Sequence, residues 1–251
     1  MVNYLRMNSE RSLKTFILGV GVDRVNYKQA LDAFESLLKS EGLSLIITTN
    51  PEMIFAASKD EQMKALIESA DLTMPDGIGL VIASKIVGQP FEERVTGIDF
   101  TYKALTRLSE LGGSVFFLGA KPGIAAKAAE NIVAEIPGLK VAGTHDGYFK
   151  PEEEEAIVDE INASGANFLC LALGAPKQEL FARKYAERLN PRVAIGIGGS
   201  LDVWSGTLNR APQFFIDHGI EWMYRLYQEP RRIGRMMKLP LFLLKVIFSK
   251  K

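Results

Sequence analysis

Asp76 has the neighbours that best suit a residue of this chain to acid–base chemistry. It stands between Pro75 and Gly77, directly after the short apolar segment 72–74. A carboxylate that a proline fixes and a glycine leaves open is rigidly placed and approachable, which suits a general base. The alternative is that Asp76 caps a helix that begins near Gly77.

Several turns rich in glycine or proline have the same expected position, at the carboxyl end of a strand. Glycine lets backbone N–H groups approach a phosphate, and the dipole of a following helix favours its negative charge. If the strands are parallel, these turns meet at one edge and form a cleft for a nucleotide or sugar nucleotide. The alternative is that each turn only separates a strand from a helix. The turns are 48–51, 75–77, 119–123, 174–179 and 196–200.

Arginines are the expected partners of the phosphates. Arg94 follows two glutamates, so it could bind a phosphate or pair with one of those neighbours. Arg225, Arg232 and Arg235 recur at spacings of seven and three. They would share one face if a helix ran through Pro230 with a kink. The alternative is a solvated basic face that binds lipid headgroups.

Other catalytic arrangements are absent from the sequence. It has no Walker A motif, no Cys/His cluster, and no Asp-x-Asp pair of the kind that many sugar-nucleotide enzymes use to hold a divalent metal. We therefore expect neither a metal nor a cofactor, and charge on a leaving diphosphate would fall to Arg, Lys and backbone N–H groups. The turn after Gly119 is loosely similar to a dinucleotide fingerprint, but it lacks the G-x-G-x-x-G spacing.

The elements that must position these residues alternate between strands and helices. Apolar strand-like segments are expected at 16–20, 44–49, 72–74, 114–119, 140–144, 168–173 and 193–197, with helical patterns between them. Continuous apolar strands in βαβ order predict an α/β fold, a Rossmann-like parallel sheet with helices on both faces. The pattern changes near Asn209. We expect a catalytic domain over 13–209 and a basic, amphipathic helical appendage over 210–251.

The tail combines charge with apolar residues. Residues 225–251 carry eight Lys or Arg and one acid, a net charge of +7, although the whole chain has 30 basic and 30 acidic residues. The apolar run 239–248 is shorter than the ~18 residues that span a bilayer, so we expect peripheral contact with an anionic membrane. Lys245, Lys250 and Lys251 would then meet headgroups. The single cysteine, Cys170, is expected to pack in a strand, which suits a cytosolic protein.

With these motifs the chain resembles the WecG/TagA/CpsF glycosyltransferase family over about residues 16–235. So many motifs in order are far more specific than any one of them. They are Thr48-x-Asn-Pro-Glu52, Pro75-Asp-Gly-x-Gly79, Glu93-Arg-Val-x-Gly-x-Asp99, Leu118-Gly-Ala120, Gly147-Tyr-Phe149, Leu173-Gly-Ala-Pro-Lys-Gln-Glu179, Gly198-Gly-Ser-x-Asp202, Arg210-Ala-Pro212 and Glu221-Trp-x-Tyr-Arg-Leu-x-x-Glu-Pro-x-Arg232.

The resemblance implies an inverting, metal-independent transferase on the inner face of the cell membrane. It would move N-acetylmannosamine from UDP-ManNAc to GlcNAc-diphospho-undecaprenol in a β-1,4 linkage, for wall teichoic acid or a related surface glycan. It implies that Asp76 is the base. Matched binding positions are Thr48, Asn50, Arg94, Gln178, Gly198, Gly199, Asp202, Arg225, Arg232 and Arg235.

Other interpretations remain open at this point. Within the family, the donor could instead be the uronate of N-acetylmannosamine or glucose, for common antigen or exopolysaccharide. A Rossmann-type oxidoreductase and a non-catalytic membrane adaptor are more distant alternatives. A homo-oligomer is compatible with the resemblance, and we expect no nucleic-acid partner.

Overall fold

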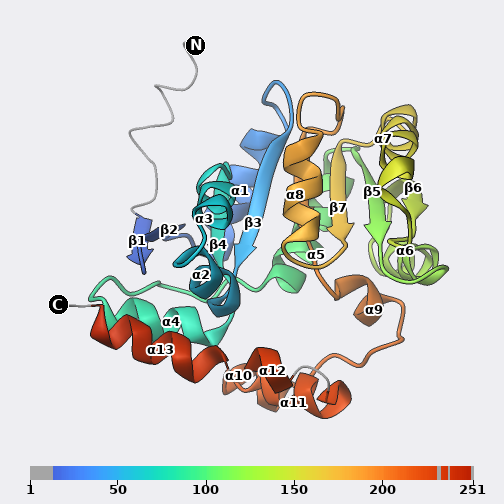
Figure 1. The fold of residues 1–251 in the computed structure, drawn as a ribbon. Coiled ribbons are helices and arrows are strands. Elements are labelled where there is room, and N and C mark those ends of the chain that lie inside the picture. Colours follow the sequence, from blue (N-terminus) through green and yellow to red (C-terminus); the bar gives the residue numbers. More distant parts are fainter. Residues whose placement is uncertain (1–13, 231–232, 237, 250–251) are drawn as a thin grey trace.

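A six-stranded parallel sheet forms the centre of the molecule. The computed structural model describes residues 14–230, 233–236 and 238–249. The strands of the sheet lie in the order β4-β3-β8-β7-β5-β6, and each neighbouring pair is parallel (Figure 1). This arrangement confirms the predicted α/β class. Their bounds are β3 Ser44–Thr49, β4 Leu72–Pro75, β5 Ser114–Gly119, β6 Lys140–His145, β7 Phe168–Ala172 and β8 Val193–Gly196.

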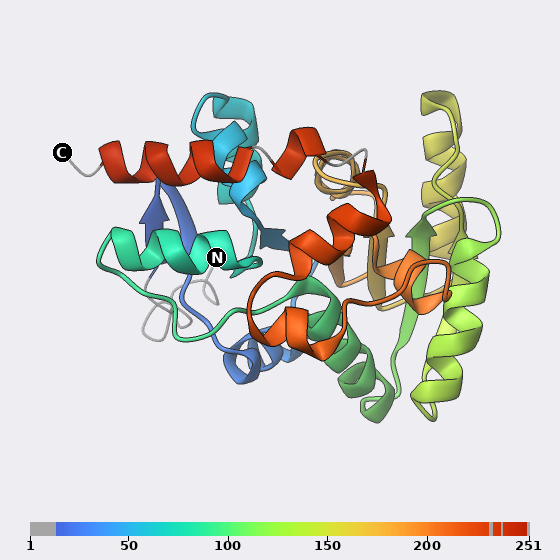
Figure 2. The same cartoon turned by 90° about the horizontal axis from the view of Figure 1, so that it is seen from below.

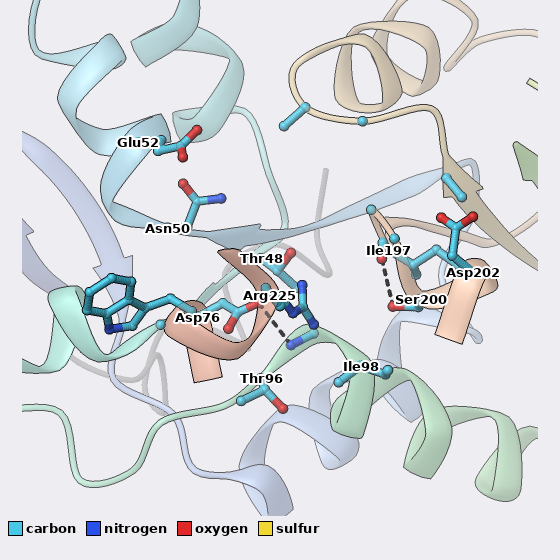
Figure 3. Close-up of a pocket in the computed structure, with 18 of the residues that line it drawn as sticks. Thr48, Asn50, Glu52, Asp76, Thr96, Ile98, Ile197, Ser200, Asp202 and Arg225 are labelled. Atoms are coloured by element: carbon cyan, nitrogen blue, oxygen red, sulfur yellow. Dashed lines mark hydrogen bonds between the residues drawn. The ribbon is translucent and has the colours of Figure 1, made fainter. Parts of the chain in front are cut away.

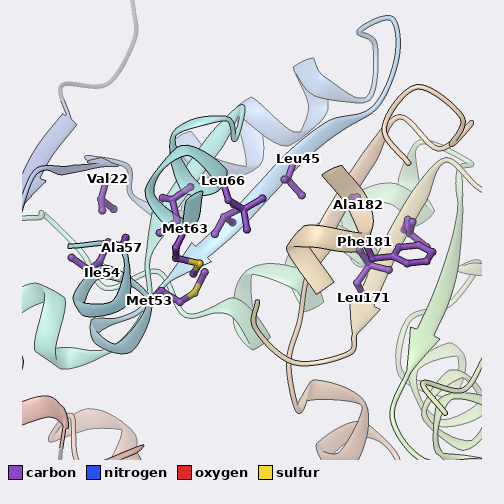
Figure 4. Packing of buried hydrophobic residues seen from close by; sticks show 14 of the residues in the cluster. Val22, Leu45, Met53, Ile54, Ala57, Met63, Leu66, Leu171, Phe181 and Ala182 are labelled. Atoms are coloured by element: carbon purple, nitrogen blue, oxygen red, sulfur yellow. The ribbon is translucent and has the colours of Figure 1, made fainter. Parts of the chain in front are cut away.

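Helices cover both faces of this sheet, as the continuous apolar strands predict. Successive residues of a strand point to opposite faces, so Ile46 of β3 enters one core and Ile47 the other. Helices α2, α3, α7 and α8 pack on the face of Ile47, and α1, α5 and α6 pack on the face of Ile46 (Figure 1). Figure 4 shows part of the core on the Ile47 face, with side chains from α2, α3 and α8. Cys170 of β7 is fully buried, which confirms its expected packing role.

Strands and helices mostly alternate along the chain. A 3-10 turn, η2 (Pro151–Glu153), leads into α7. Helix bounds are α1 Tyr27–Leu37, α2 Pro51–Ala57, α3 Glu61–Glu68, α4 Ile78–Ile86, α5 Gly97–Glu110, α6 Ile124–Glu135, α7 Glu154–Ala163, α8 Lys177–Lys184, α9 Ser200–Trp204, α10 Gln213–Asp217, α11 Glu221–Gln228, α12 Ile233–Met236 and α13 Lys238–Phe248.

The first expected strand, 16–20, is wrong as a single strand of the main sheet. The segment instead forms an antiparallel hairpin of β1 (Lys14–Ile17) and β2 (Val20–Asp23). Leu18 and Gly19 form its turn with φ of +52° and +83°. Positive φ at both central residues gives a hairpin turn whose twist matches that of the strands. Leucine is not a typical residue for such a turn, so the sequence pattern did not indicate it.

Helix α13 packs on the α/β part of the chain rather than standing apart from it. It contacts α2 and α4, and Phe242 and Val246 are fully buried in the same core as Val22 of β2 (Figures 1 and 2). The opposite side of α13 is exposed and apolar. Its exposed large side chains are Leu241, Leu244, Ile247 and Phe248.

Two expectations for the tail need correction. The side chain of Lys245 does not extend toward headgroups, because its Nζ donates to Ser58 Oγ at 2.8 Å. The helix carrying Arg225 does not run through Pro230 either. It ends at Gln228, as expected for a helix whose continuation would place a proline in its interior. Lys250 and Lys251 lie outside the described residues.

Within the described ranges, every helix is too short or too polar to cross a bilayer.

Candidate active site

The carboxyl ends of all six strands surround one cavity of about 770 Å³. Asp76 follows β4, Thr48 lies in β3, and the turns after β5, β6, β7 and β8 supply further walls. The remaining wall comes from the C-terminal helices, with Glu221, Trp222 and Arg225 among its residues. The parallel order of the strands thus brings together turns that are distant in the sequence, as ligand sites in such sheets require.

Most of the predicted site residues meet at this cavity. Arg235 lies in α12, and Arg232 lies outside the described residues. The predicted residues that line the cavity are Thr48, Asn50, Asp76, Arg94, Gln178, Gly198, Gly199, Asp202 and Arg225. Figure 3 shows Asp76, Thr48 and Arg225 close together, with Asp202 and Ser200 at the other side of the view.

Asp76 is a half-buried carboxyl held by the backbone on both sides. Its N–H donates to Thr49 O at 2.8 Å, and its Oδ2 accepts from Gly97 N at 3.2 Å. The expected alternative, a cap on the helix after Gly77, is not what forms, because no side chain caps α4. Asp76 instead accepts from the first residue of α5, which fixes its carboxyl at the cavity wall.

The electrostatic surroundings of Asp76 act in both directions. Burial raises the pKa of Asp76 above the usual aspartate value, and the negative charge of Glu221 raises it further. The Gly97 N–H bond and the cations Arg225 and Arg94 lower the pKa but do not cancel the effect of burial. The group therefore holds a proton more tightly than a free aspartate does, which makes it a stronger base once ionised.

Glu221 joins the two arginines beside Asp76. Its Oε1 lies 3.1 Å from Arg225, and its Oε2 lies 3.5 Å from Arg94. Glu93, one of the two neighbours expected to pair with Arg94, instead accepts from the backbone N–H of Tyr27. The pair with Arg94 connects α11 to the loop before α5, and the pair with Arg225 lies within α11. They also keep two guanidinium groups at the cavity, where an anionic substrate would meet them.

Close packing sets the position of Asp76 relative to β3. A Cβ added at Gly97 would lie 3.1 Å from Thr48 Cγ2 and 3.4 Å from Asp76 Oδ2. Thr48 Oγ1 reaches across to Gly196 O of β8 at 3.4 Å. The glycine therefore lets the start of α5 approach the strand ends closely enough to bond Asp76.

Asn50 and Gln178 make structural bonds as well as facing the cavity. Asn50 Oδ1 accepts from Met53 N at 3.0 Å and so caps α2, with Pro51 in the first turn where its missing N–H costs nothing. Gln178 is buried and bonds the turns that contain Gly174 and Gly198. The side chain of Asp202 lies on α9, near Gly199.

Some cavity residues were not identified from the sequence. Glu221 and Trp222 belong to a motif quoted above, yet only Arg225 and Arg232 of that motif were predicted to act. Tyr148 follows β6 and is 70% exposed at the cavity, and Lys121 follows β5. The position of Tyr148 and Lys121 after a strand was the sequence signal that could have identified them.

Metal ligands do not cluster in the described part of the chain. No three His, Cys, Asp or Glu side chains there come together as a metal site. Independence from a metal stays a prediction, because the phosphates of a bound substrate could also hold a cation.

This fold, with a carboxylate and two arginines lining a cavity at the strand ends, suits a transferase that acts on a phosphorylated substrate. The glycosyl transferase WecG/TagA/CpsF family model matches residues 15–251. A Bacillus spizizenii (strain W23) protein named N-acetylglucosaminyldiphosphoundecaprenol N-acetyl-beta-D-mannosaminyltransferase is 40% identical over 204 residues, 81% of this chain and 79% of that protein. A Bacillus subtilis (strain 168) protein of the same name is 34% identical over 208 residues, 83% of this chain and 80% of that protein. The chain belongs to the WecG/TagA/CpsF glycosyltransferase family, as its motifs predicted.

Proposed function

We propose that this enzyme transfers N-acetylmannosamine from UDP-ManNAc to the GlcNAc of GlcNAc-diphospho-undecaprenol, with a β-1,4 linkage and inversion. The names of both Bacillus relatives support the sugar and the acceptor. The observation that carries the proposal is the cavity itself. It joins a proton-accepting carboxyl, Asp76, to the cations Arg94 and Arg225. An acceptor hydroxyl and a departing diphosphate need these two kinds of group.

In the proposed reaction, Asp76 takes the proton from the acceptor 4-hydroxyl. The oxygen attacks the anomeric carbon of the donor while the bond to UDP breaks, and the electron pair leaves with the diphosphate. One displacement without an enzyme nucleophile inverts the anomeric configuration. The pKa of Asp76 is raised by burial, which increases its strength as a base in this step.

Charge on the departing UDP needs compensation. Arg94 and Arg225 supply it together with the backbone N–H groups of the glycine turns after β7 and β8. In the structure both arginines already pair with Glu221. A diphosphate would compete with this carboxylate, so Glu221 keeps the two cations close together before substrate arrives. We propose that no metal is needed for the transfer.

The acceptor's polyprenyl chain gives the enzyme a reason to meet a membrane. The exposed apolar side of α13, from Leu241 to Phe248, supports peripheral contact with the inner face of the cell membrane. The product would prime wall teichoic acid or a related surface glycan.

A donor panel tests the proposal most simply. The purified protein is mixed with a soluble GlcNAc-diphospho-lipid and, separately, UDP-ManNAc, its uronate or UDP-glucose, with and without EDTA. We expect mass spectrometry to find a disaccharide lipid with N-acetylmannosamine only, in amounts equal to the UDP released and unaffected by EDTA. Preference for the uronate or glucose would reassign the donor. Absence of any disaccharide would overturn the proposal.

A further inference from the structure

Gln178 and Glu179 form a buried polar pair at the base of the cavity, where α8 begins. Both residues are almost fully buried, with Gln178 at 3% and Glu179 at 1% exposure. Buried glutamates are rare and normally have partners for both oxygens. This pair therefore calls for a physical reason beyond packing.

The amide of Gln178 connects two glycine turns. Its Oε1 accepts from Gly174 N at 3.2 Å, in the turn after β7. The same oxygen accepts from Gly198 N at 3.3 Å, in the turn after β8. Both turns line the cavity, and both glycines have positive φ, +79° and +51°. Without this oxygen, the N–H groups of Gly174 and Gly198 would lose their hydrogen-bond partner, and glycine has the least restricted backbone.

The carboxyl of Glu179 fixes which way the amide points. Gln178 Nε2 donates to Glu179 Oε1 at 2.8 Å. Because two backbone N–H donors meet the oxygen side of the amide, the nitrogen side must face an acceptor, and Glu179 supplies it. Gly196 leaves space for this bond, since a Cβ there would lie 2.6 Å from Glu179 Oε1.

Glu179 suits this task in its neutral form. Its Oε2 is buried and has no hydrogen-bond partner in the described chain. Burial raises the pKa of Glu179, and the bonds from Gln178 and from its own backbone N–H lower it only in part. A neutral carboxyl still offers Oε1 as an acceptor and avoids burying an unpaired charge.

We propose that Glu179 is a positioning residue, whose carboxyl orients the Gln178 amide so that this amide ties together the two glycine turns of the cavity. The pair then sets the spacing of the two turns, whose other backbone N–H groups meet the donor. This inference rests on the proposed function for its effect on substrate, and on the hydrogen bonds alone for its effect on the turns.

The test uses the full chain with two matched replacements. Glu179→Gln keeps an acceptor oxygen without a charge, and Glu179→Met keeps the volume but removes the acceptor. We expect Glu179→Met to speed amide exchange at Gly174 and Gly198 in the unliganded protein by about tenfold. We expect it to raise the donor KM by about tenfold with a smaller change in kcat, because a loosened turn weakens binding before and during transfer alike. Glu179→Gln and the exposed-site control Glu187→Gln should match the wild type.

A double replacement separates positioning from direct action. If Glu179 acts through Gln178, adding Glu179→Met to Gln178→Met should change the donor KM by less than about twofold. Equal losses in Glu179→Gln and Glu179→Met would overturn the proposal, because they would show a need for the charge. Lowered thermal stability of Glu179→Met with unchanged amide exchange at both turns would also overturn the proposal. If Glu179→Met does not fold, Gln178→Met must speed exchange at both turns together. A wild type that transfers no sugar would refute the proposed function. The amide-exchange data would still decide whether Glu179 positions the two turns.

Discussion

Asp76 shows how much a single residue depends on groups that the chain brings to it from afar. Its backbone position follows from Pro75 and Gly77, and a sequence pattern can predict that much. Its pKa depends on burial and on Gly97, Arg225 and Glu221, which only the folded chain brings near. As a base, Asp76 must be ionised, so the transfer rate should fall as the pH drops through its raised pKa.

Two charge replacements should move this acid limb in opposite directions. Glu221→Gln removes an anion that raises the pKa of Asp76, so the limb should shift to lower pH. Arg225→Gln removes a cation that lowers the pKa, so the limb should shift to higher pH. The measurement is kcat/KM against pH for both variants and the wild type. Shifts in the same direction would contradict the assigned electrostatics.

The close approach at Gly97 gives a second prediction. In Gly97→Ala, the new methyl group would press on Thr48 Cγ2 and on the Asp76 carboxyl. A small misplacement of a catalytic group is costly, so we expect the transfer rate to fall about 10- to 100-fold. Gly234→Ala is the matched control, because its Cβ would meet open space. Equal rates in the two variants would show that this packing does not position Asp76.

Residue patterns missed the contacts between side chains that are far apart in the sequence. Arg94 and Glu221 are 127 positions apart, and nothing near Arg94 indicates that Glu221 is its partner. The bond from Gly198 to Gln178 likewise joins two turns that only the strand order makes neighbours. Strand-end position could be predicted for both turns, whereas the side chains that meet there could not.

At the scale of elements, α13 has two apolar sides with different environments. The apolar run was expected to be a membrane foot, and the buried side of the helix is instead part of the core. Composition could not separate these sides, because both carry Leu, Ile, Val or Phe. The hairpin of β1 and β2 was missed for a related reason, since its apolar residues continue through the turn.

Neighbouring residues of α13 offer a matched test. Phe242 is fully buried, so Phe242→Ala should lower the free energy of unfolding by about 3–5 kcal/mol. Leu241 is 54% exposed, so Leu241→Ala should change it by no more than about 0.5 kcal/mol. Denaturant unfolding of both variants measures this difference. Similar losses, or none, would mean that α13 does not pack as described.

The whole molecule combines a cavity at the strand ends with an apolar helix face on its C-terminal part. The order of strands and helices could be predicted, because each apolar run has a period and a length. The spatial order β4-β3-β8-β7-β5-β6 could not, because strand neighbours depend on crossovers rather than on local pattern.

Removing the exposed apolar side of α13 should separate membrane contact from chemistry. We expect Leu244→Ser with Phe248→Ser to weaken binding to anionic vesicles about tenfold or more, since each side chain is at least half exposed and free to enter the interface. Transfer to a lipid-free acceptor should stay unchanged. Undiminished sedimentation with vesicles would place membrane contact elsewhere.

Asp76→Asn tests the central claim most directly. Burial raises the pKa of Asp76, so its ionised form destabilises the fold above that pKa, and an uncharged Asn should not lower the thermal stability at neutral pH. We predict that UDP still binds and that transfer to the soluble acceptor falls by about 10²- to 10⁴-fold. A loss of less than about tenfold, with folding and UDP binding intact, would contradict the role of Asp76 as the base.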